Sequence, residues 1–361
     1  MNKKHLLVIL LMLAFAVLAS GCGSRSMMTA AGWPGVTADD ESVYVAFNNH
    51  VYAINLDNGS LRWRFPAEPE TTTTFYAAPA LDQGNQLIAG SYDSSLYSLD
   101  PANGQLLWQY EAAEGRYIAS PIVSDGLIFA PSGDNELHAL DLDGFPQWAQ
   151  PFETAGPNWS QPVTDQECDC VFLASMDQRV YAIDPQSGRQ IWVSEELGGA
   201  IVSAPAISPD RLLFVGTFYN EMIALNADTG TIEWRFSTQE WVWDDPVVYD
   251  SAVYFGDLSG TFYALDTQTG KSLWQVQPGS GAIVGKPLVT AEGIYFTTDE
   301  GALIFVTHAG VIQWNQTFEG QLDTGPVAAG DLIILAANNA DTLIYAVNQN
   351  GILVWSFTPG K

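Results

Sequence analysis

Basic residues are scarce in this sequence. Its 361 residues include 13 lysines and arginines against 41 aspartates and glutamates, which gives a formal net charge of −28. A protein that binds nucleic acid needs a basic stripe to neutralise phosphates, and the chain has neither such a stripe nor a reading motif. An acidic surface also repels anionic lipid headgroups, while it favours solubility. The composition therefore excludes nucleic-acid binding.

Side chains that could perform catalysis or bind metals are also few. The four histidines are His5, His50, His138 and His308. They share no position in the repeat described below, so we expect no histidine cluster. No Gly-x-Ser-x-Gly elbow occurs. Gly270-Lys271-Ser272 resembles the end of a phosphate-binding loop, but Leu265 stands where that loop requires a glycine. We therefore expect no catalytic residue, no metal site and no enzyme activity.

The chain has three cysteines, Cys22, Cys168 and Cys170. The last two flank Asp169 directly before an expected strand at residues 171–174. In an exported protein such a pair can form a disulfide. Alternate residues of a strand point in opposite directions, however, so this bridge would require a bulge or a turn. The sequence leaves a local disulfide and two free thiols open, but two cysteines without a third ligand do not predict a metal site.

The one long apolar run lies at the N-terminus. Lys3 and Lys4 precede an apolar stretch over residues 6–18 and the small residues Ala19-Ser20-Gly21-Cys22. This order predicts a lipoprotein signal peptide over residues 1–21, because the run is short for a membrane span. Cys22 resembles the cysteine of a bacterial lipobox, although Ala19 stands where leucine is commoner. We expect lipidation of Cys22 by acyl chains such as palmitate, followed by a flexible tether to residue 32.

One pattern fills the rest of the chain. A glycine followed four residues later by a tryptophan recurs eight times, and successive tryptophans stand 40 to 45 residues apart. The glycines are Gly59, Gly104, Gly144, Gly188, Gly230, Gly270, Gly310 and Gly351. The tryptophans are Trp63, Trp108, Trp148, Trp192, Trp234, Trp274, Trp314 and Trp355. A period of this length across the chain indicates a repeat architecture.

Each unit contains four expected strands. A short run such as 180–183 alternates in the manner of a strand, and Asp-x-x-x-Gly predicts a turn with the glycine at positive φ. The residues around each tryptophan form the next strand, and a third lies upstream, as at 252–256. A fourth, small-residue strand begins at a proline. These prolines are Pro34, Pro79, Pro121, Pro162, Pro205, Pro246, Pro287 and Pro326.

Eight such units predict an all-β fold, an eight-bladed β-propeller of four-stranded antiparallel blades over residues 33–361. The first and last units both contain all four strands. We therefore expect the ring to close by packing between blades 1 and 8, while an added edge strand from residues 24–31 stays open.

The pattern Tyr-Ala-Leu-Asp-x-x-Thr-Gly-x-x-x-Trp resembles the tryptophan-docking repeat of the quinoprotein (PQQ)-like propellers, from about Trp33 to Phe357. Over its whole length the chain resembles the BamB family of outer-membrane-protein assembly lipoproteins. That resemblance implies a monomeric, non-enzymatic scaffold in the periplasm, docked to the β-barrel assembly machinery. PQQ is not expected, because the dehydrogenases that bind it carry adjacent cysteines and a calcium-binding acidic set that have no match here.

Two other functions stay open at this point. The first is a surface lipoprotein that binds sugars, peptides or cell-wall material, which would suit the outer face of the cytoplasmic membrane in a single-membrane bacterium. The second is a PQQ-dependent dehydrogenase, which the spacing of Cys168 and Cys170 disfavours.

Aromatic and charged residues gather in the loops before the innermost strands. These loops should meet at one mouth of the central channel, where aromatic anchors could bind a partner. The candidate rim residues are Tyr76, Tyr117, Trp159, Trp241, Trp243, Asp244, Asp245 and Lys286. Alternatively, these side chains pack between blades as caps. Trp241 and Trp243 are the strongest rim candidates, because they stand outside the eightfold ladder.

Overall fold

The regular elements of the described residues are all strands. The computed structural model describes residues 33–69, 73–82 and 85–360. These residues form 32 β-strands in eight four-stranded antiparallel sheets. Among them no helix is long and apolar enough to cross a membrane. The predicted signal peptide, Cys22, the tether and any edge strand from residues 24–31 lie outside the described residues.

The first four sheets comprise strands β1 to β16. Blades 1 and 2 contain β1 (Gly35–Ala38), β2 (Ser42–Phe47), β3 (His50–Asn55), β4 (Leu61–Phe65), β5 (Ala80–Asp82), β6 (Gln86–Gly90), β7 (Leu96–Leu99) and β8 (Leu106–Tyr110). Blades 3 and 4 contain β9 (Ile122–Ser124), β10 (Leu127–Pro131), β11 (Glu136–Asp141), β12 (Phe152–Glu153), β13 (Val163–Asp165), β14 (Cys170–Ala174), β15 (Val180–Ile183) and β16 (Gln190–Val193).

The other four sheets comprise strands β17 to β32. Blades 5 and 6 contain β17 (Ala206–Ile207), β18 (Leu212–Thr217), β19 (Glu221–Asn226), β20 (Ile232–Ser237), β21 (Val247–Tyr249), β22 (Ala252–Gly256), β23 (Phe262–Asp266) and β24 (Ser272–Val276). Blades 7 and 8 contain β25 (Leu288–Val289), β26 (Ile294–Thr297), β27 (Ala302–Val306), β28 (Ile312–Thr317), β29 (Val327–Ala329), β30 (Leu332–Ala336), β31 (Ile344–Asn348) and β32 (Leu353–Phe357).

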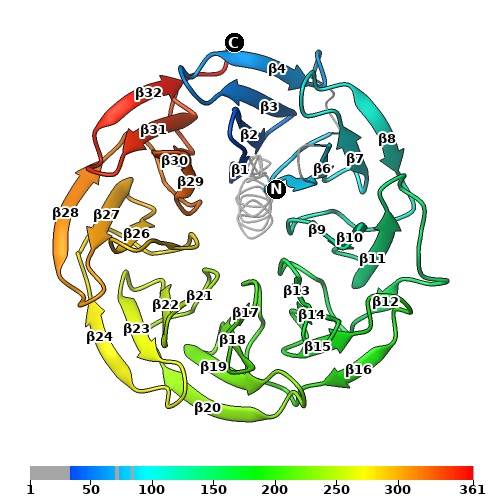
Figure 1. The fold of residues 1–361 in the computed structure, drawn as a ribbon, viewed down its shortest axis with the longest axis vertical. Helices are drawn as coiled ribbons and strands as arrows, with labels where there is room; N and C mark the ends of the chain where they lie inside the picture. The colour runs from blue at the N-terminus through cyan, green and yellow to red at the C-terminus, as the bar shows by residue number, and fades with distance from the viewer. Residues whose placement is uncertain (1–32, 70–72, 83–84, 361) are drawn as a thin grey trace, which may run out of the picture. The chain divides into compact units, whose positions relative to one another are not determined.

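The sheets stand as blades around one ring (Figure 1). In each blade the strands pair in chain order, the first nearest the axis and the fourth at the periphery. The predicted eight-bladed propeller is confirmed. Each predicted proline directly precedes an innermost strand, as Pro205 precedes β17 and Pro246 precedes β21. A proline fits there because its missing N–H is not needed by the ladder.

The repeated glycines and tryptophans hold neighbouring blades together. All eight turn glycines have a positive φ, as predicted, between 65° and 84°. A Cβ on Gly270 would lie 2.6 Å from Cδ2 of Trp234, so the glycine allows the indole of the preceding blade to lie flat against the turn. The same indole donates from Nε1 to the carbonyl oxygen of Thr267 at 2.8 Å. The tryptophan of one blade therefore docks on the turn of the next.

The ladder also closes the ring. Trp355 of blade 8 contacts Gly59 of blade 1, and its Nε1 donates to the carbonyl oxygen of Leu56 at 2.8 Å. Thr324 Oγ1 donates to the carbonyl oxygen of Pro34 at 2.7 Å. Side chains of blades 1 and 8 share one hydrophobic cluster. Among the described residues no strand of one terminal blade completes the other, so the two are joined by the expected packing together with these side-chain hydrogen bonds.

The third blade departs from the prediction. Trp148 was expected to lie in a strand, but the fourth strand of blade 3 is the two-residue β12, which begins after it. The expectation is wrong because Pro146 and Pro151 flank the tryptophan, and proline cannot donate to a strand ladder. The docking contact survives nevertheless. Trp148 is buried, and its Nε1 donates to the carbonyl oxygen of Pro185 at 2.9 Å.

Candidate functional site

The innermost strands and the loops that precede them, here called the mouth loops, enclose a central cavity of about 670 Å³. All eight blades contribute to its lining. Much of the wall is apolar, as at Val36, Val202 and Val284. Four charged side chains, Asp244, Asp245, Lys286 and Asp323, also line it. The mouth loops therefore meet at the channel, as predicted.

A chain of four aromatic rings crosses the channel mouth. Trp33, in the segment before β1, packs edge-on against Trp243, which precedes β21, with ring centroids 5.3 Å apart. Blades 1 and 6 are not neighbours, so this contact spans the mouth. Phe218 stacks on Trp243 at 5.1 Å and on Trp241 at 4.7 Å. Trp241 is 43% exposed and Trp33 is 42% exposed, so these aromatic rings offer apolar surface to a partner.

A second aromatic group lies in blade 2. Tyr76 lines the cavity and packs on Tyr92, with ring centroids 4.2 Å apart. The guanidinium carbon of Arg116 lies 5.2 Å from the Tyr92 centroid, within the range of a cation–π contact. Burial raises the pKa of both tyrosines, so their hydroxyls stay protonated at neutral pH.

The two adjacent aspartates of the mouth differ in what they bind. Asp244 is buried; its Oδ2 accepts from the Gly256 N–H at 2.8 Å, and its Oδ1 has no partner among the described residues. Burial raises the pKa of Asp244 well above its ordinary value. Asp245 accepts from the Ala204 N–H at 2.6 Å. Burial also raises the pKa of Asp245, while the exposed Lys286 opposes that rise.

Only some of the candidate rim residues lie at the cavity. Tyr117 is fully buried between blades 2 and 3, so of the two alternatives it is a cap and not a rim residue. Asp244 is also buried and accepts from the Gly256 N–H, but it belongs to the cavity wall. Trp159 is half-buried and lies outside the cavity lining. Tyr76, Trp243, Asp245 and Lys286 line the cavity.

Sequence reasoning missed Trp33 and Phe218 as parts of the site. Trp33 marked only the start of blade 1. Phe218 lies in the turn between β18 and β19, and the residue after it, Tyr219, stands where the matching turns of blades 2, 3 and 4 carry an aspartate. Phe218-Tyr219 in a turn of this kind was a usable signal.

Asp323 gives the channel a pH-dependent charge. Burial raises its pKa from 3.8 to about 6, Asn338 opposes the rise and Asp299 adds to it. Between these two pKa values the native state therefore holds a proton that the unfolded chain releases, and the stability of the fold falls as pH rises from about 4 to about 6.

We expect Asp323→Asn to raise the melting temperature near neutral pH by a few degrees. Below about pH 4 the difference should vanish, because aspartate is then protonated in both states. An equal gain at both pH values would contradict this account.

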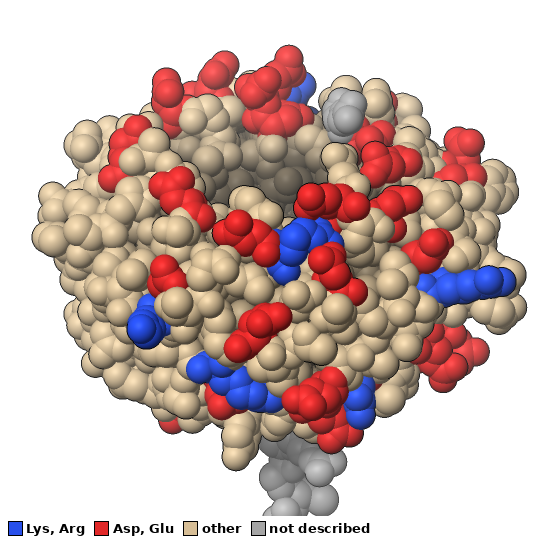
Figure 2. Space-filling view, turned by 60° about the horizontal axis from the view of Figure 1, so that its bottom comes forward, with Lys and Arg blue, Asp and Glu red and all other residues tan. Residues whose placement is uncertain are grey.

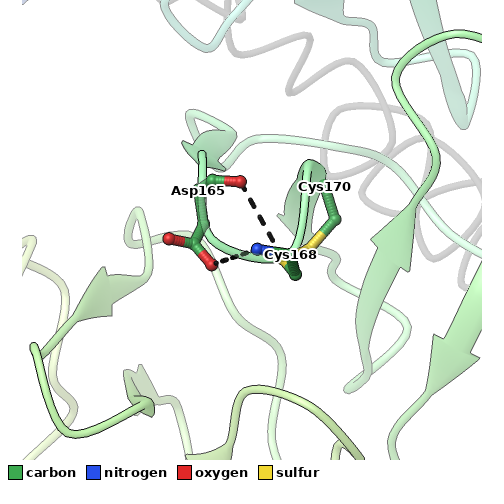
Figure 3. Close-up of side chains that lie close together, drawn as sticks. All are labelled: Asp165, Cys168 and Cys170. Atoms are coloured by element: carbon green, nitrogen blue, oxygen red, sulfur yellow. Dashed lines mark hydrogen bonds between the residues drawn. A yellow bond between two sulfur atoms is a disulfide. The ribbon is translucent and has the colours of Figure 1, made fainter.

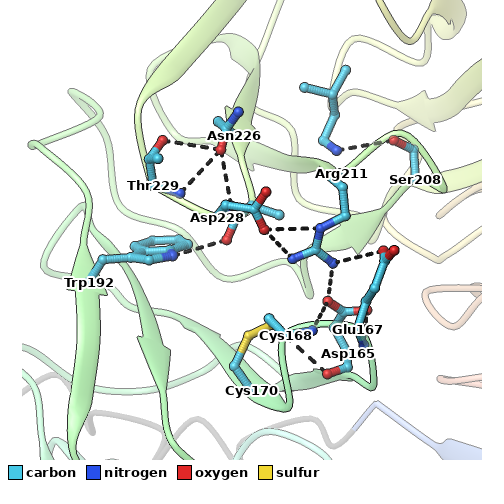
Figure 4. Close-up of polar contacts among 12 residues, drawn as sticks. Asp165, Glu167, Cys168, Cys170, Trp192, Ser208, Arg211, Asn226, Asp228 and Thr229 are labelled. Carbon is cyan, nitrogen blue, oxygen red and sulfur yellow. Dashed lines mark hydrogen bonds and ion pairs between the residues drawn. A yellow bond between two sulfur atoms is a disulfide. The ribbon is translucent and has the colours of Figure 1, made fainter.

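Cys168, in the loop between β13 and β14, forms a disulfide with Cys170, the first residue of β14 (Figure 3). Asp169 between them adopts a left-handed φ of 48°, which supplies the turn that such a bridge requires. Next to the bridge, Arg211 pairs with Asp165 and, at 2.6 Å, with Asp228 (Figure 4). Neither cysteine lines the central cavity. The disulfide and the ion pairs of Arg211 together stabilise the loops between the first two strands of blades 4 and 5.

Loss of this disulfide should have a small effect. It closes a very short loop, so the chain-entropy contribution is only about 1–2 kcal/mol. We expect the double variant Cys168→Ser/Cys170→Ser to lower the free energy of unfolding by that amount in urea titrations. Reducing agent should bring the wild type to the same value. A loss comparable to that of a core tryptophan would contradict this interpretation.

The surface is acidic beyond the mouth loops as well. Figure 2 shows acidic side chains scattered over one face and around its hollow, with few basic ones among them. This distribution agrees with the formal charge of −28.

The fold and the tryptophan ladder define the chain as a PQQ-like eight-bladed β-propeller. A family model described as outer membrane protein assembly factor BamB matches residues 47–195, 176–284 and 259–360. The chain belongs to this family.

Individual relatives are distant. BamB of Bordetella pertussis is 24% identical over 306 residues, which is 81% of this chain and 74% of that protein. The crystal structure of BamB from Moraxella catarrhalis superposes with a TM-score of 0.70 at 18% identity, covering 86% of this chain and 92% of that one, and it supports the fold. Enzymes occur among the relatives too: tetrathionate hydrolase of Acidithiobacillus ferrooxidans is 23% identical over 60% of this chain and 47% of that protein.

Proposed function

We propose that this protein is a non-enzymatic, lipid-anchored scaffold that takes part in the assembly of outer-membrane β-barrel proteins. The family match across residues 47–360 carries the proposal. The chain would face the periplasm from the outer membrane, held by acyl chains on Cys22. A single acyl chain gives only marginal membrane binding, so a stable anchor requires two or more.

The propeller suits a scaffold physically. The ring is closed by contacts between blades 1 and 8, and its mouth carries aromatic surface at Trp33, Trp241 and Trp243. Aromatic anchors contribute most to the affinity of protein interfaces. The peripheral strands also have free edges, to which an extended chain could add by backbone hydrogen bonding. We propose a protein partner at the mouth and no PQQ or other cofactor, since the bridged cysteines lie away from the cavity.

A small-molecule binding module is the second candidate. The cavity of about 670 Å³, whose partly apolar wall carries the charged residues Asp244, Asp245, Lys286 and Asp323, favours it. A binding module for sugars, peptides or cell-wall material would need this cavity to be accessible and would not need an outer membrane.

Pull-down of the lipidated protein from its own membrane separates these functions. We expect a β-barrel assembly subunit to co-purify. Recovery of cell-wall fragments or sugars without any barrel subunit would reject the scaffold and favour the binding module. Restoration of dye-linked alcohol or sugar oxidation by added PQQ would reject both.

The anchor has its own test. Replacement of Cys22 by serine is expected to abolish incorporation of labelled palmitate and to release the protein from the membrane fraction. The parallel variant Cys168→Ser should stay in that fraction. Unchanged labelling of the Cys22 variant would contradict the proposed anchor.

A further inference from the structure

Blade 3 departs from the repeat at one position of its third strand. In blades 2, 4 and 6 this strand carries a tyrosine whose hydroxyl donates to an aspartate of the preceding turn. The pairs are Tyr97–Asp93 at 2.7 Å, Tyr181–Asp177 at 2.6 Å and Tyr263–Asp257 at 2.8 Å. Blade 3 keeps the aspartate, Asp134, but has His138 in place of the tyrosine.

Only one of the two ring nitrogens of His138 has a hydrogen-bond partner among the described residues. His138 is 2% exposed, and its Nδ1 lies 3.1 Å from the Tyr110 hydroxyl. Nε2 has no hydrogen-bond partner among the described residues and lies 3.5 Å from Oε2 of Glu136. The Tyr117 hydroxyl, on the adjoining mouth loop, is also buried without a partner among the described residues. Buried polar atoms of this kind indicate a bound ion or ordered water.

Two carboxylates lie close to this ring. Glu136 and His138 lie on the same face of β11, because alternate strand residues point the same way, and Asp134 lies in the turn before them. One ligand atom from each of these three residues lies within 4.8 Å of the other two. Glu136 also stands directly opposite Glu153 of β12, a pairing of like charges that is unfavourable without a cation.

We propose that Asp134, Glu136 and His138 bind a divalent transition metal ion of the zinc class. Imidazole nitrogen and carboxylate oxygen are its usual ligands. Metal–ligand bonds of about 2.0–2.2 Å in a tetrahedral site separate the ligand atoms by roughly 3.3–3.6 Å. The 3.5 Å between His138 Nε2 and Glu136 Oε2 matches that spacing.

The neighbouring residues fit this role. If Tyr110 accepts the Nδ1–H, the Nε2 lone pair faces the carboxylates, which is the common arrangement around a metal-bound histidine. Burial lowers the pKa of His138, so the ring is neutral at neutral pH. Asp134 already accepts the backbone N–H groups of Glu114 and Gly115 at 2.7 and 2.9 Å. The ion would thus fix the mouth loop between blades 2 and 3.

The test uses the full chain stripped with a chelator and titrated with zinc and with cobalt. We expect one ion per chain by calorimetry, a visible cobalt absorption band and a higher melting temperature with zinc. His138→Tyr restores the residue of blades 2, 4 and 6, so it should fold while binding at least roughly 100-fold more weakly. Tyr110→Phe should weaken binding by about 10–100-fold, as the loss of an orienting partner does.

Two controls keep the result interpretable. His50→Gln removes a histidine of blade 1 and should bind as the wild type does. Glu136→Gln is nearly isosteric and partly exposed, so it serves if the tyrosine variant fails to fold, and it must also weaken binding. The proposal is overturned if the wild type binds neither metal at millimolar concentration, in which case the site holds water alone. Undiminished binding by the His138 or Glu136 variant would overturn it equally.

Discussion

Truncation of Trp355 to alanine is expected to lower the free energy of unfolding by about 3–5 kcal/mol. The indole is 8% exposed, and its packing on Gly59 and its bond to the Leu56 carbonyl both disappear in this variant. These contacts join blades that no covalent connection holds side by side. Urea titration followed by tryptophan fluorescence measures the loss.

Two matched variants locate the effect. Trp63→Ala removes the equivalent contact between blades 1 and 2, which the chain itself links, and it should cost about the same packing energy. Only Trp355→Ala, however, should expose the sheets of blades 1 and 8 to limited proteolysis under native conditions. Trp355→Phe should recover part of the stability. Equal proteolysis of both alanine variants would contradict closure by packing at this one junction.

The double variant Trp241→Ala/Trp243→Ala is expected to weaken capture of the barrel assembly partner by at least roughly 30-fold, the equivalent of about 2 kcal/mol. Both indoles stack on Phe218, and Trp241 is 43% exposed. Their removal deletes the aromatic surface of the mouth and frees Trp33 from its contact. Surface plasmon resonance with the partner identified by pull-down measures the change.

Leu273→Ala is the matched control. Leu273 is 54% exposed on β24, a peripheral strand of the same blade that Trp243 precedes. Its loss should leave affinity within twofold, because an isolated surface leucine contributes little. If the leucine variant lost as much affinity as the tryptophan pair, the binding surface would be the blade edge instead of the mouth.

The sequence predicts the blades almost residue by residue, because each blade depends on local patterns. The turn from Asp266 to Gly270 and the strand around Trp274 follow from alternation and turn chemistry within a dozen residues. The prediction fails where a local signal conflicts with the repeat pattern: Pro146 and Pro151 prevent the strand expected at Trp148. A proline has no N–H to donate to the strand ladder, although the repeat predicts a strand there.

The mouth could not be predicted to the same degree. Trp33 and Trp243 are more than two hundred residues apart, and only the closed ring brings their rings to 5.3 Å. The different directions of Tyr117 and Tyr76, however, follow from their positions in the repeat. Tyr117 stands four residues before Pro121 and is buried, as Phe75 is at the same position of blade 2, whereas Tyr76 stands three residues before Pro79 and lines the cavity. The sequence did not predict the proposed site at His138, because only a cluster of histidines was considered, whereas the neighbours of His138 are carboxylates.

The central claim is that this chain serves the assembly of outer-membrane β-barrel proteins. The most direct measurement is the amount of folded barrel protein in outer membranes of the bacterium after deletion of the gene, determined by quantitative proteomics. We predict a fall in folded barrels that the wild-type chain restores and the Trp241/Trp243 double variant does not. Unchanged levels of folded barrels in the deletion strain would contradict the account.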